Sequence, residues 1–360
     1  MKRFAFKAAV LLTLAACNEP TRPAAPRSPQ ADITVGPSSQ YTLTDLGTIG
    51  GTYALAFRIN EAGQVAGWSS TATGEQHAFR WTASGGMQDL GTLAGSTGSF
   101  AWGINDQGDV AGEVDLPSGD TRAFLWTARG GMQDLGTLGG SSALALGINN
   151  RGEVVGFSTL ASGGPTHGFI WTAQAGMQDV GTFNGTNTRL RTIDNAGTTG
   201  AGSGNVASGG HAHPVLWHPT TGFQDLGTLG GEPGYAARVN DRGQVVGFSA
   251  TADVCCHAFR WTQATGMVDL GALSGSDGNS EAIDISDGER VVGSTTTQAD
   301  PNNLHAFIWT PSGGMQQLPQ FSSSEMDSEA DGVNEAGLLV GNADTPDGHS
   351  HALLWTPRAQ

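Results

Sequence analysis

Short apolar runs separated by glycine and polar residues recur along the chain from residue 41 onward. One run ends in Ile or Val followed by Asn or Asp, with a Gly three residues later, as in Ile59-Asn60-Glu61-Ala62-Gly63. The next three runs contain Val-Val-Gly, His-Ala-Phe-x-Trp and Met-x-Asp-Leu-Gly. Asn followed by such a Gly between apolar runs is typical of a β-hairpin, because Asn caps the turn and Gly accepts a positive φ. The pattern predicts four short strands in each unit and no helix of useful length.

Tryptophan marks the period of these units, which is about 45 residues. Many of the runs are apolar at successive positions, which is expected of strands covered on both faces rather than of a one-faced surface sheet. The third predicted strand of each unit closes on a Trp: Trp81, Trp126, Trp171, Trp217, Trp261, Trp309 and Trp355.

The two ends of the repeat array are offset by one strand. The array begins with Tyr41–Gly47, a fourth strand with no unit before it, and finishes at Trp355, a third strand with no fourth strand after it. The first strand can therefore complete the last unit, which would remove free sheet edges. An open solenoid would need polar capping units at both ends, and none is visible. We predict an all-β, seven-bladed β-propeller over residues 41–357, with four strands per blade and the N-terminal strand closing the last blade.

The units resemble the HAF-repeat family of extracellular bacterial repeat proteins, named after the motif His-Ala-Phe. The motif occurs at His77-Ala-Phe, His257-Ala-Phe and His305-Ala-Phe, and the resemblance extends over residues 41–357. It implies an exported β-repeat protein without assigned biochemistry. Three departures weaken the match locally. They are Arg122 in place of the His, a fourth unit with His213-Pro-Val-Leu-Trp217 and a Gly-rich stretch at 200–210, and Gln316-Gln317-Leu318-Pro319 in place of Asp-Leu-Gly.

The N-terminus has the features of an export signal. Lys2, Arg3 and Lys7 precede or flank a short apolar stretch, and Leu14-Ala15-Ala16-Cys17 resembles the bacterial lipobox. We predict a lipoprotein-type signal peptide over 1–16, lipidation of Cys17 and a proline-rich tether over 17–40. An ordinary secretory signal with a chance Cys is the alternative.

The predicted anchor places the protein at the bacterial envelope. The residue after Cys17 is Asn18 rather than Asp, which in Gram-negative lipoproteins resembles routing to the outer membrane. We therefore expect the domain to be exported and lipid-anchored to the outer membrane or cell surface, in the periplasm or the extracellular space.

Charge limits the partners that the domain can have. The chain has 17 Lys and Arg against 33 Asp and Glu, a formal net charge of −16. Because binding to phosphates needs clustered Lys or Arg, we expect no nucleic-acid partner and membrane contact only through the lipid anchor. We expect a monomer whose partner is an unidentified glycan, peptide or envelope protein.

Sequence motifs of catalysis and cofactor binding are missing. We find no nucleophile elbow, zinc-protease helix, phosphate loop or dinucleotide fingerprint, and we predict no catalytic residue, cofactor or metal site. The repeated His residues lie in different units, too far apart to share an ion, so we predict a bond within each blade, to the Asp of the fourth strand or to Trp. These residues are His77, His167, His213, His257, His305 and His351.

Cys255 and Cys256 form an adjacent thiol pair. In an oxidising compartment they can form a vicinal disulfide, while reduced or intermolecularly paired thiols are the alternative.

A comparison of the first strands gives the candidate ligand surface. Three residues before the terminal Ile or Val, the side chain is nearly always small: Ala56, Ala101, Ala145, Leu190, Ala236, Ser280 and Ala330. The positions two and four before it lie on the opposite face and vary widely. They are Leu55 and Phe57, Phe100 and Trp102, Leu144 and Leu146, Arg189 and Arg191, Tyr235 and Ala237, Asn279 and Glu281, and Glu329 and Asp331.

This variable face is apolar in the first three units, basic in the fourth and acidic in the last two. If the first strand is innermost, the face predicts an asymmetric recognition surface around the axis. The alternative is that these side chains merely fill the channel.

We predict a non-catalytic binding or interaction module. One alternative is a propeller hydrolase or lyase acting on glycan or peptide, with Glu281, Glu329 and Asp331 as carboxylates and a raised pKa in a formed pocket as its sign. The other is a structural envelope protein with a plugged channel.

Overall fold

The computed structural model describes residues 40–185, 187–206, 210–254, 256–320, 327–344 and 348–358. Their regular structure is β-sheet, as the sequence predicts, and they include no helix long and apolar enough to cross a membrane. The predicted signal peptide, Cys17 and the tether up to residue 39 lie outside the described residues, as does Cys255. Cys256 is described and is buried.

The strands follow the four predicted runs of each unit. The first strands are β2 (Gly50–Ile59), β6 (Gly98–Ile104), β10 (Gly139–Ile148), β14 (Thr188–Ile193), β18 (Gly230–Val239), β22 (Ser280–Ile285) and β26 (Ser328–Val333). The second strands are β3 (Val65–Thr71), β7 (Val110–Asp115), β11 (Val154–Leu160), β15 (Gly200–Asn205), β19 (Val245–Thr251), β23 (Val291–Thr295) and β27 (Leu339–Asp344).

The third and fourth strands carry the Trp and Asp motifs. The third strands are β4 (Gln76–Thr82), β8 (Thr121–Thr127), β12 (His167–Thr172), β16 (Ala212–His218), β20 (His257–Thr262), β24 (His305–Thr310) and β28 (Ser350–Pro357). The fourth strands are β5 (Gly86–Asp89), β9 (Gly131–Asp134), β13 (Gly176–Gly181), β17 (Gly222–Asp225), β21 (Gly266–Gly271) and β25 (Gly314–Gln317), and β1 (Tyr41–Asp45) has the same motif.

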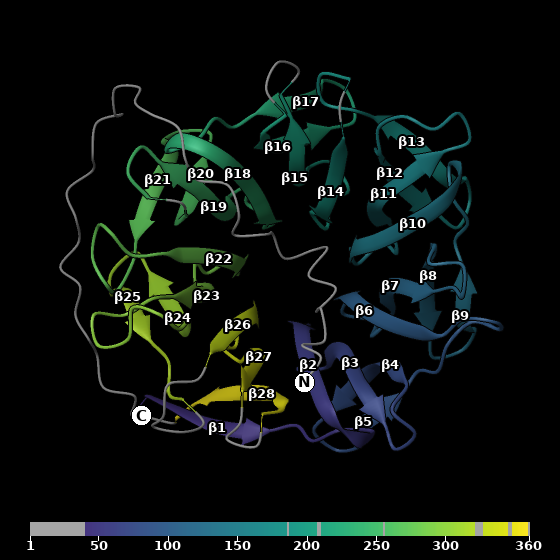
Figure 1. Ribbon diagram of the computed structural model, residues 1–360, viewed down its shortest axis with the longest axis horizontal. Coiled ribbons are helices and arrows are strands. Elements are labelled where there is room, and N and C mark those ends of the chain that lie inside the picture. Colours follow the sequence, from purple (N-terminus) through teal and green to yellow (C-terminus); the bar gives the residue numbers. More distant parts are fainter. Residues whose placement is uncertain are drawn as a thin grey trace.

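Strands of one unit pair antiparallel in chain order. Among the described residues they form five four-stranded sheets and one eight-stranded sheet, in which a single parallel contact between Gln76 and Gly98 joins two units. One sheet has the order β1-β28-β27-β26, with Tyr41 opposite Pro357 and Asp45 opposite Leu353. The first and last strands of the array are therefore hydrogen-bonded neighbours. The sheets are arranged around a common centre, with the first strands innermost (Figure 1).

The hydrophobic core lies between neighbouring sheets. Ala66 and Ala78 of one unit, for example, pack with Phe124 and Trp126 of the next. The Phe at the third position of the His-Ala-Phe motif, or of the triplet that replaces it, is fully buried in five units: Phe79, Phe124, Phe169, Phe259 and Phe307. Burial of an aromatic side chain on this scale stabilises the fold by about 2 to 3 kcal/mol each, so the motif is explained by packing.

In five of the six units that carry it, the repeated His joins the third strand to the fourth, as predicted. His305 instead lies 3.3 Å from Asp300, because its fourth strand has Gln317 where the others have the Asp. His77 Nδ1 lies 3.0 Å from Asp89 Oδ1, and the same pair occurs at His167–Asp179, His213–Asp225 and His257–Asp269. His351 pairs in the same way with Asp45 of β1, at 2.6 Å. In the second unit the Arg122 Nε lies 4.0 Å from Asp134, so the replacement keeps a cation beside the Asp.

The hairpin turns after the first strands are linked to one another by hydrogen bonds. Asn60 caps its own turn by accepting from Gln64 N at 2.8 Å, as predicted, and its Nδ2 also donates to the carbonyl of Asn105 in the next turn at 2.8 Å. Asn334 of the last turn donates in the same way to the carbonyl of Asn60, at 3.1 Å. Bonds of the same kind run from Asn105 to Asn149, from Asn149 to Asp194 and from Asn240 to Ser286.

A second set of turn-to-turn bonds involves the residue after the Asn. The backbone N–H of Glu61 donates to Asp106, that of Asp106 to Asn150 and that of Glu335 to Glu61. The intervening links are Asn150 to Asn195, Asn195 to Asp241, Asp241 to Asp287 and Gly288 to Glu335. Each turn is thus held by its neighbours, and the last is bonded to the first.

Candidate functional site

Each first strand carries a β-bulge at the same position, two residues before its terminal Ile or Val. In β2, Ala56 pairs with Gly67 and Arg58 pairs with Ala66, so Phe57 has no partner of its own. A bulge re-aims the side chain of its extra residue. The bulged residues of the seven units are Phe57, Trp102, Leu146, Arg191, Ala237, Ile283 and Asp331.

The Gly of the Val-Val-Gly motif is explained by this bulge. A Cβ on Gly67 would lie 1.9 Å from the carbonyl oxygen of Leu55, and a Cβ on Gly156 would lie 1.8 Å from that of Leu144. Backbone atoms cannot give way as a flexible side chain can. The motif therefore marks where the bulged strand comes closest to its neighbour.

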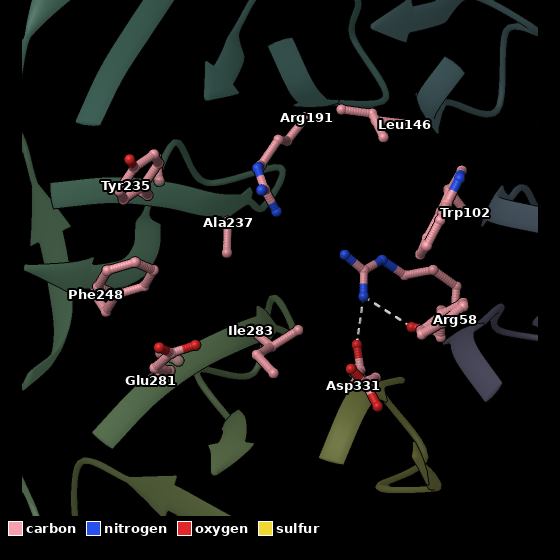
Figure 2. A pocket seen from close by; sticks show the side chains of 13 residues that line it. Arg58, Trp102, Leu146, Arg191, Tyr235, Ala237, Phe248, Glu281, Ile283 and Asp331 are labelled. Carbon is pink, nitrogen blue, oxygen red and sulfur yellow. Dashed lines mark hydrogen bonds between the residues drawn. The ribbon is translucent and has the colours of Figure 1, made fainter. Parts of the chain in front are cut away.

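All seven bulged residues line one pocket at the centre of the molecule. The pocket holds about 820 Å³ of empty space, part of it open to solvent, and the labelled side chains converge on it from different sheets (Figure 2). The remaining lining residues are Arg58, Tyr235, Ala236, Phe248, Glu281 and Ala282.

Eight of the fourteen residues of the predicted variable face meet in this pocket: Phe57, Trp102, Leu146, Arg191, Tyr235, Ala237, Glu281 and Asp331. The other six lie beside it. Leu55 and Leu144 face Trp68 and Phe157 across their sheets, Phe100 packs edge to face on Trp68 at 5.7 Å, and Arg189 lies 4.8 Å above the Phe157 ring. Glu329 accepts a hydrogen bond from Ser294 at 3.4 Å, and Asn279 precedes β22.

The alignment of the sixth unit was wrong by two residues. The structure pairs Ile285 with Val291 and places the bulge between Ala282 and Asp284, so Ala282 rather than Ser280 takes the small position. Ile283 and Ile285 are both apolar, and the sequence pattern cannot tell which one ends the strand. Because side chains alternate with a period of two, Glu281 stays on the same face, whereas Asn279 falls outside the strand.

Two important lining residues were missed. Arg58 directly follows the bulged residue. Three other units have Gly at this position, namely Gly103, Gly147 and Gly332, and the sequence comparison of the units did not include it. Phe248 lies on the second strand, directly after Val-Val-Gly. The residue at that position varies as widely between units as the first-strand positions do, so the same comparison of units would have identified it. In the seven units the position holds Trp68, Glu113, Phe157, Ser203, Phe248, Ser294 and Asn342.

Aromatic rings form two parts of the pocket wall. Phe57 and Trp102 stack with ring centroids 4.6 Å apart, and Tyr235 and Phe248 lie 5.1 Å apart. Leu146 and Ile283 add aliphatic surface. Such a wall can bind a planar apolar group.

Charged groups make up the rest of the lining. Arg58 Nη1 donates to the backbone carbonyls of Phe57, at 2.7 Å, and of Asp331 (Figure 2). The Asp331 carboxyl is buried and accepts from Asn342 Nδ2 at 2.7 Å. Next to the pocket, Asp284 is buried and pairs with Arg238 Nε at 3.1 Å.

Burial shifts the pKa of every charged group that points into the pocket. It raises the pKa of Glu281 to about 7, partly offset by attraction to Arg191. It lowers the pKa of Arg191 to about 10, and repulsion from Arg189 and Arg58 adds to this shift. It also lowers the pKa of Arg58, against the attraction of Asp284.

Carboxyls of the last unit show the same effect. Burial, with repulsion from Glu281, raises the pKa of Glu329 to about 7. Burial, with repulsion from Glu329, raises the pKa of Asp331 well above its usual value. The acidic part of the pocket is therefore partly neutral near pH 7, while the arginines remain charged.

Solved structures similar to this chain share its architecture. It is similar to the β-propeller domain of the trilobed protease from Pyrococcus furiosus, with 10% identity and a TM-score of 0.56 over 85% of this chain and 96% of that chain. The fold is a β-propeller.

The propeller is also similar to parts of larger enzymes. Acylaminoacyl peptidase from Pyrococcus horikoshii matches with 11% identity and a TM-score of 0.57, over 87% of this chain and 53% of that chain. A puromycin hydrolase matches with 12% identity and a TM-score of 0.53, over 85% of this chain and 52% of that chain. The propeller thus spans about half the length of these enzymes. No protein-family model and no curated protein matches the chain, so the resemblance to HAF repeats stays a prediction.

The lining of the central pocket is mixed in chemical character. Within the described residues, no group of three or more His, Cys, Asp or Glu side chains is placed to hold a metal. The pocket instead combines two aromatic pairs, two guanidinium groups and carboxyls around one central space, which is the usual composition of a small-molecule site.

Proposed function

We propose that this protein is a seven-bladed β-propeller that binds a small molecule in its axial pocket and does no chemistry on it. The observation that carries the proposal is that the one bulged residue of every unit reaches the same pocket. If the bulged residues only had to fill the channel, the same side chain could be repeated in every unit. The bulged residues instead range from Trp to Arg to Asp. Variation at the pocket beside repetition elsewhere supports recognition.

Seven blades are supported by the pairing of strands and turns. Seven groups of four strands share one set of motifs, with β1 taking the fourth place beside β28. The turn-to-turn hydrogen bonds link the seventh unit to the first. Closure of this kind pairs the edge of β28, which would otherwise be free at the end of the array.

A ligand screen that reads the pocket directly tests the binding function. We expect at least one compound in a set of amino acids, short peptides and oligosaccharides to raise the Tm of the domain and to change Trp fluorescence. Trp102→Leu should remove the response because it deletes half of the stacked aromatic pair. Leu144→Ala, on the corresponding face of β10 but outside the pocket, is the matched control and should keep the response. If no compound in any of these classes acts on the wild type, the binding function is wrong.

Export and anchoring are part of the proposal and rest on the N-terminal motif. Metabolic labelling with a palmitate analogue should mark the protein at Cys17, and Cys17→Ser should remove the label and release the domain from the membrane fraction. Labelling that survives the substitution would contradict the anchor.

A hydrolase or lyase acting on glycan or peptide is the second candidate, and one observation favours it. Glu281 lines a formed pocket with a pKa of about 7, which suits a general acid or base near neutral pH. Several similar propellers belong to peptidases. Cleavage of a peptide or glycan substrate that is abolished in Glu281→Gln, with binding of the same substrate retained, would establish the enzyme in place of the pure binding module.

A further inference from the structure

We propose that the axial pocket accepts a free amino acid with an aromatic side chain, held by its carboxylate at Arg58 and Arg191 and by its ammonium at Glu281. This inference rests on the proposed binding function and names the class of ligand.

The two arginines form the anion-binding part. Both guanidinium groups point into the central space from different sheets, Arg58 from β2 and Arg191 from β14 (Figure 2). Arg58 uses Nη1 for the backbone carbonyls of Phe57 and Asp331, and its buried Nε has no hydrogen-bond partner among the described residues. The two like charges repel each other across the space. A carboxylate between them would relieve that repulsion and accept hydrogen bonds from both.

Glu281 lies on the opposite side of the pocket, on β22. Its carboxyl accepts no hydrogen bond from the described residues, yet it faces the same space as Arg191 (Figure 2). Phe248 lies next to it, and an aromatic face also attracts a cation. A ligand ammonium would give the carboxyl the partner that the protein does not supply.

Aromatic and aliphatic side chains supply the third contact. Trp102 and Leu146 border the pocket on the side away from Glu281 (Figure 2), and Phe57 stacks on Trp102. A planar ring placed there would contact apolar atoms rather than charge. A ligand that presents an anion, a cation and a ring within the size of one amino acid satisfies all three parts together.

The charges around the pocket agree with a zwitterion rather than with a simple anion or cation. Arg58 and Arg191 contribute positive charge to the lining, while Glu281 and Asp331 contribute carboxyls. Arg238 and Asp284 pair with each other beside it. A simple anion would leave the ionised fraction of Glu281 without a cation, and a simple cation would leave the guanidinium groups without an anion. A zwitterion places its carboxylate against the guanidinium groups and its ammonium against Glu281, whose ionised form the ammonium would favour.

The test compares three probes that differ by one charged group each. Calorimetry at pH 7 would measure L-phenylalanine, 3-phenylpropionate, which lacks the ammonium, and 2-phenylethylamine, which lacks the carboxylate. We expect L-phenylalanine to bind about tenfold more tightly than either of the others, because each buried charge-assisted contact contributes at least that factor. Equal affinity for L-phenylalanine and 3-phenylpropionate would overturn the role of Glu281, and with it the ligand class.

Two variants assign the contacts. Arg191→Met should weaken L-phenylalanine and 3-phenylpropionate about tenfold while leaving 2-phenylethylamine within about threefold. Glu281→Gln should bring L-phenylalanine down to the affinity of 3-phenylpropionate. Arg129→Met, at an exposed position outside the pocket, is the matched control. The wild-type comparison of the three probes remains decisive if a variant does not fold.

The outcomes separate this inference from the proposed function. If none of the three probes binds while a saccharide or a longer peptide binds in a Trp102-dependent way, the amino-acid inference is wrong and the binding function stands. If nothing in the wider screen binds, both are wrong.

Discussion

The hairpin turns and the bulges lie only three residues apart in each unit, yet they behave in opposite ways. The turns repeat one solution, a polar side chain that bonds its own turn and the next one, as Asn60, Asn105 and Asn149 do. The bulges present a different side chain in almost every unit, such as Phe57, Arg191 and Asp331. The turns hold the units in register with one another. The bulges need only point inward, so their side chains are free to differ.

The largest effect should come from removing the backbone space that the bulge requires. Gly156→Ala places a Cβ 1.8 Å from the Leu144 carbonyl oxygen, and we expect a loss of about 3 kcal/mol or more in the free energy of unfolding. Urea denaturation would measure it. Gly200→Ala, where the closest atom to the new Cβ is 3.3 Å away, is the control and should change stability far less. A mild effect at Gly156 would show that the bulge can relax.

A smaller loss is expected when one turn-to-turn link is broken. Asn149→Ala removes the donor to the Asp194 carbonyl and the acceptor for Glu153 N at a buried position. We expect a loss of about 2 kcal/mol, since buried backbone groups are left without partners. Asn302→Ala, at an exposed residue, provides the comparison. Similar denaturation midpoints for the two variants would mean that the turns are not what holds the units together.

The pocket carboxyls should make stability depend on pH. Because the folded-state pKa values of Glu281 and Glu329 are raised to about 7 from 4.5, folding favours their protonated forms. The contribution of these protonated carboxyls to the free energy of unfolding is fully present below pH 4.5 and is lost as the pH rises to about 7. Glu281→Gln should reduce the difference in the free energy of unfolding between pH 5 and pH 8 by on the order of 2 kcal/mol. Denaturation at pH 5 and pH 8 measures it, and an unchanged slope in the variant would place the titration elsewhere.

The smallest effect on stability should come from a bulged side chain itself. Ile283 is half-buried and borders the pocket, so Ile283→Ala should cost less than about 1 kcal/mol. Val292→Ala, at a fully buried position of the neighbouring strand, should cost about 1 to 3 kcal/mol. Thermal unfolding of the two variants gives the comparison, and the opposite order would mean that the pocket wall is part of the core.

Much of the fold was predictable because it follows from repetition. The apolar runs, the Trp period and the offset of Tyr41 and Trp355 predicted the strands and the pairing of β1 with β28, and the His–Asp pairs follow from the same register. The bulge was not predictable, since it depends on how β2 and β3 meet rather than on a residue signature. Without it, the role of Arg58 and the reason for the Gly in Val-Val-Gly could not be recognised.

The candidate site was half predictable. Comparing units identified the face that carries Phe57, Trp102 and Glu281, because packing repeats and recognition does not. It misplaced the sixth unit, where Ile283 and Ile285 are equivalent in hydropathy. It also missed Phe248, since the pocket wall includes a second strand that only the folded arrangement brings to the axis.

The pairing of β1 with β28 also determines how the molecule responds to force. In its sheet, β1 is the outermost strand, and residues 1–39 continue directly from it. Any pull on that segment is carried first by the contacts between β1 and β28, including the Leu46 N–H bond to the Ala352 carbonyl and the contact of His351 with Asp45. A load on the N-terminal segment is therefore applied where the two ends of the array meet. This is the outer edge of the last sheet, whereas the pocket-lining strand β26 lies at its inner edge. Mechanical failure would begin there and leave the pocket intact until the outer strand had detached.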